Sequence, residues 1–488
     1  MTHTLTPIGV LACLMALTSP AAAQEATSGD AHPLFGEAPE VTVLPNGLRV
    51  ISIAWPSPGI VAYYTLVRVG SRDEVEAGHS GFAHLFEHMM FKGTRAMSGD
   101  EYERRIQGLG ADNNAYTTRD FTMYTVTAPA EELRAVVDLE AERFQRLSFT
   151  EELYRTETGA VQGEYAKSAS SPSLPMWEAL SGLAFRDHTY GHTTLGFLAD
   201  ICSMPGEVDY ARRFFARFYT PDNTTIIVAG DVDHATLVRE VRRAYGRWRG
   251  RRARVNVRAE SAVRSGAEHL VWNGSAPPRM LLGYRTPAFA GDASRRAERP
   301  RALRETAALD VVRTLVLSEA SPLVQRLVTE ERTLLDLRGY AQPSRDPGLF
   351  VVSATFPPPD DAPAVATRDA AFDAAQDAIQ AAFDGVAGGE VSTERFERTR
   401  SHLRYALLAD VAPPSDAADL VGRMIAVGGE SDDLSRYLRA LDAVTREDVA
   451  HVAGSYLLPE RRVRVTLAPP SPGESPPERQ EPLCPEAP

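Results

Sequence analysis

The chain has 488 residues, of which 43% are hydrophobic and 24% are charged, and its formal net charge is -13. Because single hydrophobic cores stop growing at about 250–300 residues, this length suits two or three domains of ordinary globular composition. The acidic balance disfavours a surface for nucleic acid or an anionic membrane. We therefore expect a multidomain protein that binds no nucleic acid and makes no stable membrane insertion.

The first 23 residues have the pattern of a secretory signal peptide. A short apolar run from Ile8 to Leu17 is followed by three small residues, Ala21 to Ala23, which suit a cleavage site before Gln24. The run is too short to span a membrane stably, and no cysteine follows it at the spacing of a lipoprotein. We expect an exported protein, either periplasmic or secreted.

The segment His-Leu-Phe-Glu-His at residues 84–88 is the most informative motif of the chain. Histidines at positions i and i+4 project from one face of a helix, so His84 and His88 can reach the same metal ion. Glu87 lies on the same arc, where it can activate a water molecule without binding the metal. The alternative is that both histidines merely pack in an ordinary helix.

The next informative stretch is Phe121 to Thr127, which alternates aromatic, β-branched and polar residues. This alternation predicts an edge strand, and the preceding residues 113–115 are interpreted as a turn or strand entry.

A third metal ligand has two candidates on one helix. Residues 150–169 predict a helix with Thr150 as its N-cap and acidic residues in its first turn. Glu157 and Glu164 are two turns apart on this helix and therefore share a face. A catalytic zinc site uses three protein ligands and keeps the fourth position for water, so either glutamate can complete the set.

The chain divides near residues 250–266. The basic run at 247–254 lacks apolar periodicity and is interpreted as the start of a solvated linker, with an anion-binding patch as the alternative. Beyond it, strand and helix patterns echo the order of the first half. The sequence thus predicts two similar α+β domains, 36–250 and 267–468, joined by a linker at 251–266. Only the first contains His-x-x-Glu-His, so one metal site per chain is expected.

The C-terminal tail, residues 469–488, contains eight prolines and cannot bury a core, so we expect it to be disordered. Once the signal peptide is removed, Cys202 and Cys484 are the two remaining cysteines. Because Cys484 lies in the tail, a structural disulfide is not expected.

Together these motifs resemble the inverzincin metallopeptidases, the family of pitrilysin, insulysin and the mitochondrial processing peptidases. Glu164 stands where that family places its ligand glutamate, and Glu157 matches a second acidic position that supports the site. The resemblance runs from about residue 38 to 468 and is strongest in the first half. Further matching segments are 44–50, 113–117, 218–223 and 230–232.

The resemblance implies an α+β fold of two homologous domains, each an antiparallel-rich sheet with helices packed on one face. It implies one Zn2+ per chain, held by His84, His88 and Glu164, with Glu87 as the general base. Glu157 would support the ligands without binding the metal itself. The alternative is that Glu157 replaces Glu164 as the third ligand.

The resemblance also assigns a peptide-binding segment. Asn114 and Ala115 would contact the substrate beside the cleaved bond, where an edge strand pairs with the peptide backbone. The alternative is that the segment is a structural strand with a polar turn.

The implied activity is that of a zinc-dependent endopeptidase acting on short or unfolded peptides. Active family members usually bring an arginine and a tyrosine from the second half to the substrate's carbonyl, but the aligned positions here hold Val328 and Leu335. Neither side chain can donate a hydrogen bond to an oxyanion. Arg332, Arg338 or Tyr340 can replace them only after realignment, so we expect a homologous partner chain to supply the pair in a heterodimer, or failing that a homodimer.

Two alternatives remain. The chain could be a catalytically idle, zinc-binding assembly subunit, but Glu87 argues against this because a structural site needs no base. It could also be an amidase using the same centre, but the Asn114 segment argues against this because small substrates need no strand-pairing edge.

Overall fold

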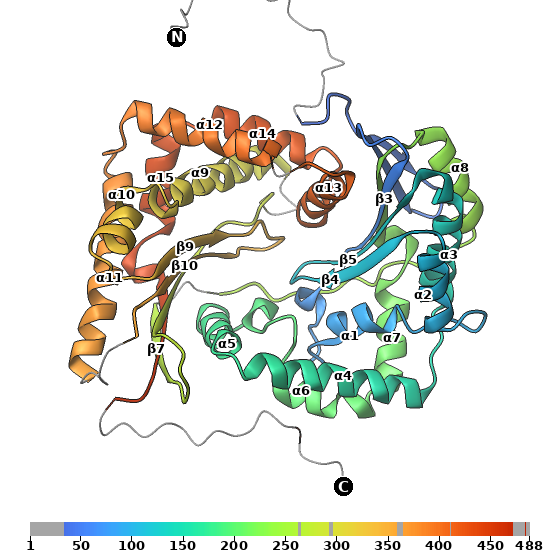
Figure 1. The fold of residues 1–488 in the computed structure, drawn as a ribbon, viewed down its shortest axis with the longest axis horizontal. Coiled ribbons are helices and arrows are strands. Elements are labelled where there is room, and N and C mark those ends of the chain that lie inside the picture. The colour runs from blue at the N-terminus through green and yellow to red at the C-terminus, as the bar shows by residue number, and fades with distance from the viewer. Residues whose placement is uncertain are drawn as a thin grey trace, which may run out of the picture.

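The computed structural model describes residues 34–261, 265–291, 296–358, 365–409 and 411–471, together with Cys484. The expected signal peptide and most of the proline-rich tail lie outside these ranges. Figure 1 shows two halves side by side, each built on one sheet. Within the described ranges, no helix combines the length and apolar character needed to cross a membrane.

The two sheets have the same strand order, except that the first has an additional edge strand, β1. The first sheet runs β1-β2-β6-β3-β5-β4 and the second β7-β11-β8-β10-β9. The last strand of each half pairs in parallel with one neighbour, β6 with β2 in the first sheet and β11 with β7 in the second. On its other side each pairs antiparallel, β6 with β3 and β11 with β8. The strands of the first sheet are β1 (Glu40–Val43), β2 (Arg49–Ala54), β3 (Ile60–Val67), β4 (Asp112–Thr117), β5 (Thr122–Pro129) and β6 (Thr224–Gly230). Those of the second are β7 (Gly266–Val271), β8 (Arg279–Arg285), β9 (Asp336–Ala341), β10 (Leu349–Thr355) and β11 (Arg462–Ala468).

Helices cover both sheets, so the expected α+β class is confirmed. The first half contains α1 (Phe82–Met89), α2 (Gly99–Gly108), α3 (Leu133–Arg146), α4 (Glu151–Ala169), α5 (Ser173–Ala184), α6 (Leu198–Ser203), α7 (Val208–Phe218) and α8 (His234–Tyr245). The second half contains α9 (Arg299–Leu317), α10 (Pro322–Val324), a π-helix (Gln325–Glu330), α11 (Val365–Ala387), α12 (Thr393–Ala409), α13 (Pro414–Gly428), α14 (Asp433–Ala443) and α15 (Arg446–Tyr456).

The core of the first half lies between its sheet and the helices that follow in sequence. Buried residues of β3, such as Val61 and Tyr63, pack in one cluster with Phe86 of α1, Val137 of α3 and Phe214 of α7. Burying large apolar side chains on one sheet face supplies most of the stability of such a layer. This packing fixes α1, which carries the motif, against the sheet.

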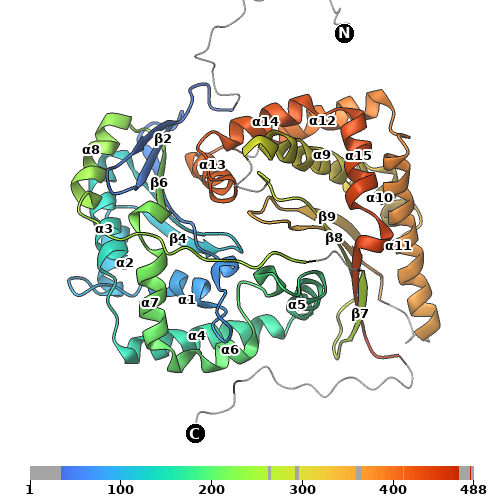
Figure 2. The same cartoon turned by 180° about the vertical axis from the view of Figure 1, so that it is seen from behind.

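The opposite faces of the sheets are covered reciprocally by a helix from the other half. Val421 and Ile425 of α13 share a buried cluster with Ile227 of β6 in the first sheet. Leu180 of α5 shares one with Val465 of β11 in the second sheet. Figures 1 and 2 show α13 beside the first sheet and α5 beside the second. The two halves therefore share their hydrophobic cores.

The prediction that residues 121–127 form an edge strand is wrong, because one further strand lies outside them. Residues 122–129 form β5, an inner strand between β3 and β4, and the edge is β4, whose described residues pair with β5 alone. The two-residue alternation reports which faces of a strand are buried, but it does not report whether a neighbour lies on each side. Asn114 and Ala115 consequently lie on the edge strand itself, rather than in a turn before it.

The expectation of no structural disulfide is also wrong. Cys202, in α6, is bonded to Cys484 across a sequence separation of 282 residues. The second half ends close enough to the first for the tail to reach α6, a proximity that a sequence pattern does not carry.

Candidate metal centre

The motif helix α1 is held at its N-terminus by Glu74. One oxygen of this buried carboxylate accepts a hydrogen bond from the Gly81 N–H at 2.8 Å, and the other accepts from Ala83 N–H at 2.7 Å. Free N–H groups at a helix start attract a carboxylate in this way. Burial raises the pKa of Glu74 to about 8, although both backbone donors oppose the shift. Gly81 has φ of 90°, and an added Cβ would lie 2.7 Å from Leu195 O, so the entry to α1 requires glycine.

The structure brings His84, His88 and Glu164 together. One ligand atom of each lies within 4.8 Å of the others. The Nε2 atom of His84 is 3.3 Å from Oε2 of Glu164, and Nε2 of His88 is 3.5 Å from Oε1. The two histidine rings come from α1 and stand nearly perpendicular, at 84°. The glutamate comes from α4, whose N-cap is Thr150 as expected, with its hydroxyl accepting from Leu153 N–H.

These distances fit a tetrahedral zinc ion. Ligand atoms about 2.0–2.1 Å from such an ion lie about 3.3–3.5 Å from one another. The two nitrogen–oxygen separations here match that edge length. The histidine side chains are only 12% and 19% exposed, whereas Glu164 is 46% exposed, so the cluster opens to solvent on the glutamate side. Three ligands with one open side are the arrangement of a catalytic site, since water must reach the fourth position.

Proton affinities around the cluster favour metal binding. Burial lowers the pKa of His88, and the neighbouring His84 lowers it further. The ring of His88 therefore stays neutral at a lower pH than the ring of an ordinary histidine. The hydrogen bond from His84 lowers the pKa of Glu164. A neutral imidazole and an ionised carboxylate are the forms that bind zinc.

Glu87 occupies the position expected of a base. It is partly exposed on α1, one residue before His88. With the described residues it makes no hydrogen bond or ion pair, so its carboxylate is available to a water molecule.

Glu157 lies one layer behind the cluster. Its side chain is only 7% exposed, with Oε1 2.9 Å from Nζ of Lys92 and Oε2 3.9 Å from Nδ1 of His88. Lys92 and Glu74 are the supporting residues that the sequence interpretation missed. For Lys92 a signal existed, because it is one of two lysines in the whole chain and follows the motif by one helical turn.

Asn114 and Ala115 lie on β4, at the edge of the first sheet. Asn114 Oδ1 accepts a hydrogen bond from Ala115 N–H at 2.8 Å, and its backbone oxygen accepts from the Thr125 hydroxyl at 3.3 Å. The strand packs next to α1, so an extended chain paired with β4 would pass beside the motif helix.

The aligned positions of the second half carry no hydrogen-bonding side chain. Val328 belongs to the π-helix and packs against the buried core. Leu335 is 54% exposed just before β9.

Comparison with known proteins agrees with this arrangement. Residues 49–197 match Insulinase (Peptidase family M16), and residues 207–403 match the Peptidase M16 inactive domain. An uncharacterized zinc protease of Streptomyces coelicolor is 25% identical over 428 residues, which cover 85% of this chain and 86% of the relative. One from Mycobacterium bovis is 28% identical over 444 residues, covering 90% and 95%. The solved structure of a Helicobacter pylori protease superposes with a TM-score of 0.77 at 24% identity, covering 88% of this chain and 99% of the other.

Two sheets of one strand order, with a His-x-x-Glu-His helix in the first half only, define the class as that of the two-domain inverzincins. The chain belongs to the M16 peptidase family, and the resemblance drawn from its motifs is confirmed.

Proposed function

We propose that this chain is a zinc-dependent endopeptidase that hydrolyses short or unfolded peptides, with one Zn2+ held by His84, His88 and Glu164. The observation that carries the proposal is the fit of these three side chains to a tetrahedral ion on an open-sided cluster, with Glu87 beside it. The relatives, which are named zinc proteases, support the same activity.

Each residue has a distinct task in this reaction. Zinc in this position supplies a water of lowered pKa and polarises the scissile carbonyl. Glu87 accepts the proton of the attacking water at its carboxylate and then delivers it to the leaving amine, which is general acid–base work. Glu157 faces Nδ1 of His88 and thereby fixes which nitrogen of the ring points at the metal.

The substrate is a peptide in extended form. The outer edge of β4 offers backbone N–H and C=O groups that the sheet leaves unpaired, and a peptide can add there as a further strand. Asn114 and Ala115 would then lie next to the cleaved bond. Main-chain pairing makes the site tolerant of sequence, because the affinity does not depend on one side chain.

Full activity requires a second chain. Val328 and Leu335 offer no donor to the developing oxyanion, and one such donor contributes on the order of 3 kcal/mol to transition-state stabilisation. We therefore assign the missing arginine and tyrosine to a homologous partner in a heterodimer, and a homodimer is the second choice.

The protein acts outside the cytoplasm. The signal-like residues 1–23 motivate this assignment. The Cys202–Cys484 bond supports it, because disulfides persist mainly in oxidising compartments.

The test is peptide cleavage read by mass spectrometry. The mature protein, loaded with zinc, is assayed alone and with a homologue encoded beside it. Glu87→Gln removes the base without changing size, and Glu152→Gln, on the exposed side of α4, is the matched control. Cleavage that appears with the partner, survives Glu152→Gln and vanishes in Glu87→Gln supports the proposal.

A different result selects the competing function. If one zinc binds per chain but no peptide is cleaved with or without the partner, the chain is an idle assembly subunit. Ordinary cleavage rates from the chain alone would refute the need for a partner.

A further inference from the structure

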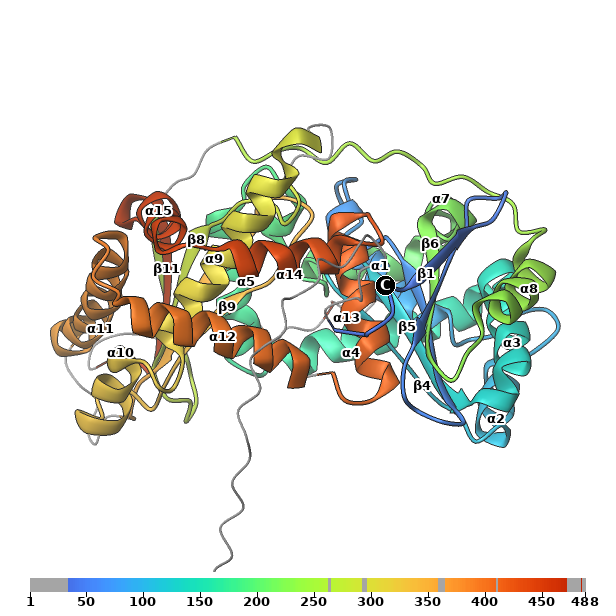
Figure 3. The same cartoon turned by 90° about the horizontal axis from the view of Figure 1, so that it is seen from above.

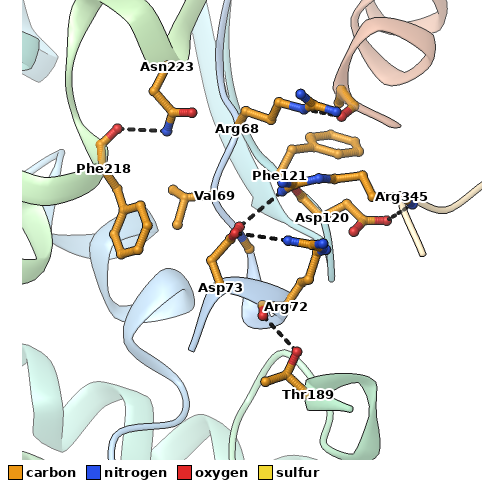
Figure 4. A network of polar contacts seen from close by, with 12 residues as sticks. Arg68, Val69, Arg72, Asp73, Asp120, Phe121, Thr189, Phe218, Asn223 and Arg345 are labelled. Atoms are coloured by element: carbon orange, nitrogen blue, oxygen red, sulfur yellow. Dashed lines mark hydrogen bonds and ion pairs between the residues drawn. The ribbon is translucent and has the colours of Figure 1, made fainter. Parts of the chain in front are cut away.

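The loop between β9 and β10 of the second half contacts polar and charged residues of the first half. Its residues Arg345 and Asp346 meet charged side chains from three separate segments of that half. Figure 4 shows Arg345, which belongs to the second half, in contact with Asp120 and Asp73 of the first half. Arg345 is only 8% exposed, so its charge depends on these partners.

Arg345 joins two segments of the first half. Its Nη1 atom donates to Oδ2 of Asp73 at 3.1 Å and to the backbone oxygen of Asp120 at 3.3 Å. Its backbone N–H donates to Oδ2 of Asp120 at 3.1 Å. The other oxygen of Asp120 accepts from the Tyr190 hydroxyl at 2.6 Å. Both aspartates are buried, so each bond is formed away from water, where an unpaired charge is costly.

The two aspartates belong to the two parts of the site. Asp120 lies in the turn that connects β4 to β5 and therefore ends the edge strand. Asp73 directly precedes Glu74, the residue that caps α1. Arg345 thus ties the end of the edge strand to the segment that anchors the motif helix.

A second contact from the same half also reaches β4. The Tyr116 hydroxyl on β4 donates to Asp419 of α13, and Arg423 of α13 lies over the tyrosine ring. The second half therefore contacts the edge strand near its C-terminal end, at Tyr116, and at the turn that follows it.

We propose that Arg345 is a positioning residue that holds the edge strand β4 in register with the motif helix α1, so that the half without metal ligands sets how a peptide lies at the metal. This inference rests on the proposed function only for the identity of the ligand. The register between β4 and α1 is a property of the chain itself and can be measured without substrate.

The experiment compares Arg345→Gln with Arg49→Gln. Arg49, on β2, also donates across the two halves, to Gly429 O at 3.1 Å, but β2 is four strands away from β4 in the sheet. Arg345→Gln loses the two side-chain bonds of Nη1 between the halves, and Arg49→Gln loses one. Three quantities are measured: zinc content, hydrogen exchange of residues 112–117, and the separate kcat and KM for a peptide.

We expect Arg345→Gln to retain zinc, to exchange residues 112–117 faster, and to raise KM about tenfold while kcat changes much less. Arg49→Gln should leave β4 exchange and KM unchanged. Arg345→Lys keeps the positive charge but loses the planar guanidinium group with its several N–H donors. It should therefore show slower exchange of residues 112–117 and a lower KM than Arg345→Gln. A loss of general stability alone would affect the two glutamine variants alike.

The inference is overturned if Arg345→Gln and Arg49→Gln have the same β4 exchange and the same KM. Should Arg345→Gln fail to fold, Asp73→Asn weakens the bond to Nη1 of Arg345 from the other side and is judged by the same two measurements. If the wild-type protein cleaves no peptide with or without the partner, the proposed function fails, whereas the exchange of residues 112–117 still decides the role of Arg345.

Discussion

The ammonium group of Lys92 lies 2.9 Å from one oxygen of Glu157, and the second oxygen of that carboxylate faces Nδ1 of His88 at 3.9 Å. The lysine comes from the end of the motif helix and the glutamate from α4, so the pair joins the two helices that carry the metal cluster. A cation held here orients Glu157 behind His88, as outer residues do in metal sites.

Replacing Lys92 with methionine should therefore weaken zinc binding about tenfold without loss of fold, because it acts through Glu157 rather than on the metal. Competition with a chromophoric chelator measures the zinc affinity. Arg155→Met, on an exposed turn of α4 and paired with Glu151 rather than with the cluster, is the control. Equal affinities in the two variants would show that the Lys92 contact is without consequence for the metal.

The two glutamates of α4 should behave differently on conversion to glutamine. Glu164→Gln removes the charge of a carboxylate whose Oε2 lies 3.3 Å from Nε2 of His84 and whose Oε1 lies 3.5 Å from Nε2 of His88, so bound zinc should be lost on dialysis. Glu157→Gln should retain one zinc per chain with an affinity about 10–100-fold lower. Metal analysis after dialysis distinguishes the two, and retention of zinc by Glu164→Gln would make Glu157 the ligand.

The contact between the halves should weaken in acid. Burial alone would raise the pKa of Asp346, but hydrogen bonds from His188 and Arg72 outweigh it and hold the pKa well below the usual range. A carboxyl with a lowered folded-state pKa stabilises the protein above its unfolded pKa and loses that contribution as the pH falls.

Asp346→Asn should accordingly reduce the free energy of unfolding near neutral pH, and the difference from the wild type should shrink below about pH 4. Urea unfolding at a series of pH values measures it. Asp100→Asn, on exposed α2, should show no such trend. A difference that stays constant down to low pH would contradict the assignment.

The secreted form should begin at Gln24 and contain one disulfide. Intact-mass analysis of protein from the medium or periplasm should give a chain without residues 1–23, lighter than its reduced form by two hydrogen atoms. Cys202 and Cys484 should resist alkylation until a reductant is added. Recovery of the chain only from the cytoplasm, with both thiols free, would count against export.

Leu180, fully buried on α5, tests the shared core. Leu180→Ala should cost about 2–5 kcal/mol of unfolding free energy, because it leaves a cavity against β11 of the other half. Urea unfolding checks the value. The exposed Leu335→Ala is the control, and a loss of similar size there would show that the effect is not one of burial.

Local signals predicted α1 and α4 because their evidence lies within two turns of each residue. The i, i+4 histidines and the Thr150 cap are both properties of neighbouring positions. The presence of two similar α+β units was also predicted, since strand and helix patterns recur in the same order, but the strand order within each sheet was not.

Relations between distant segments were not predictable in this way. The inner place of β5, the disulfide and the Arg345 contacts each depend on what lies beside a segment in space. Periodicity reports burial, but it does not name the neighbour. No local pattern marks Arg345, because its partners Asp120 and Asp73 stand more than two hundred positions earlier.

The exchange of α5 and α13 between the halves, seen from above in Figure 3 as well, bears on how this chain can be divided. Cutting it at the linker would not release two working domains, since each fragment would present a bare apolar sheet face to water. The half that lost its metal motif cannot be discarded for the same reason. Selection for a stable first half is therefore enough to keep the second half in the chain.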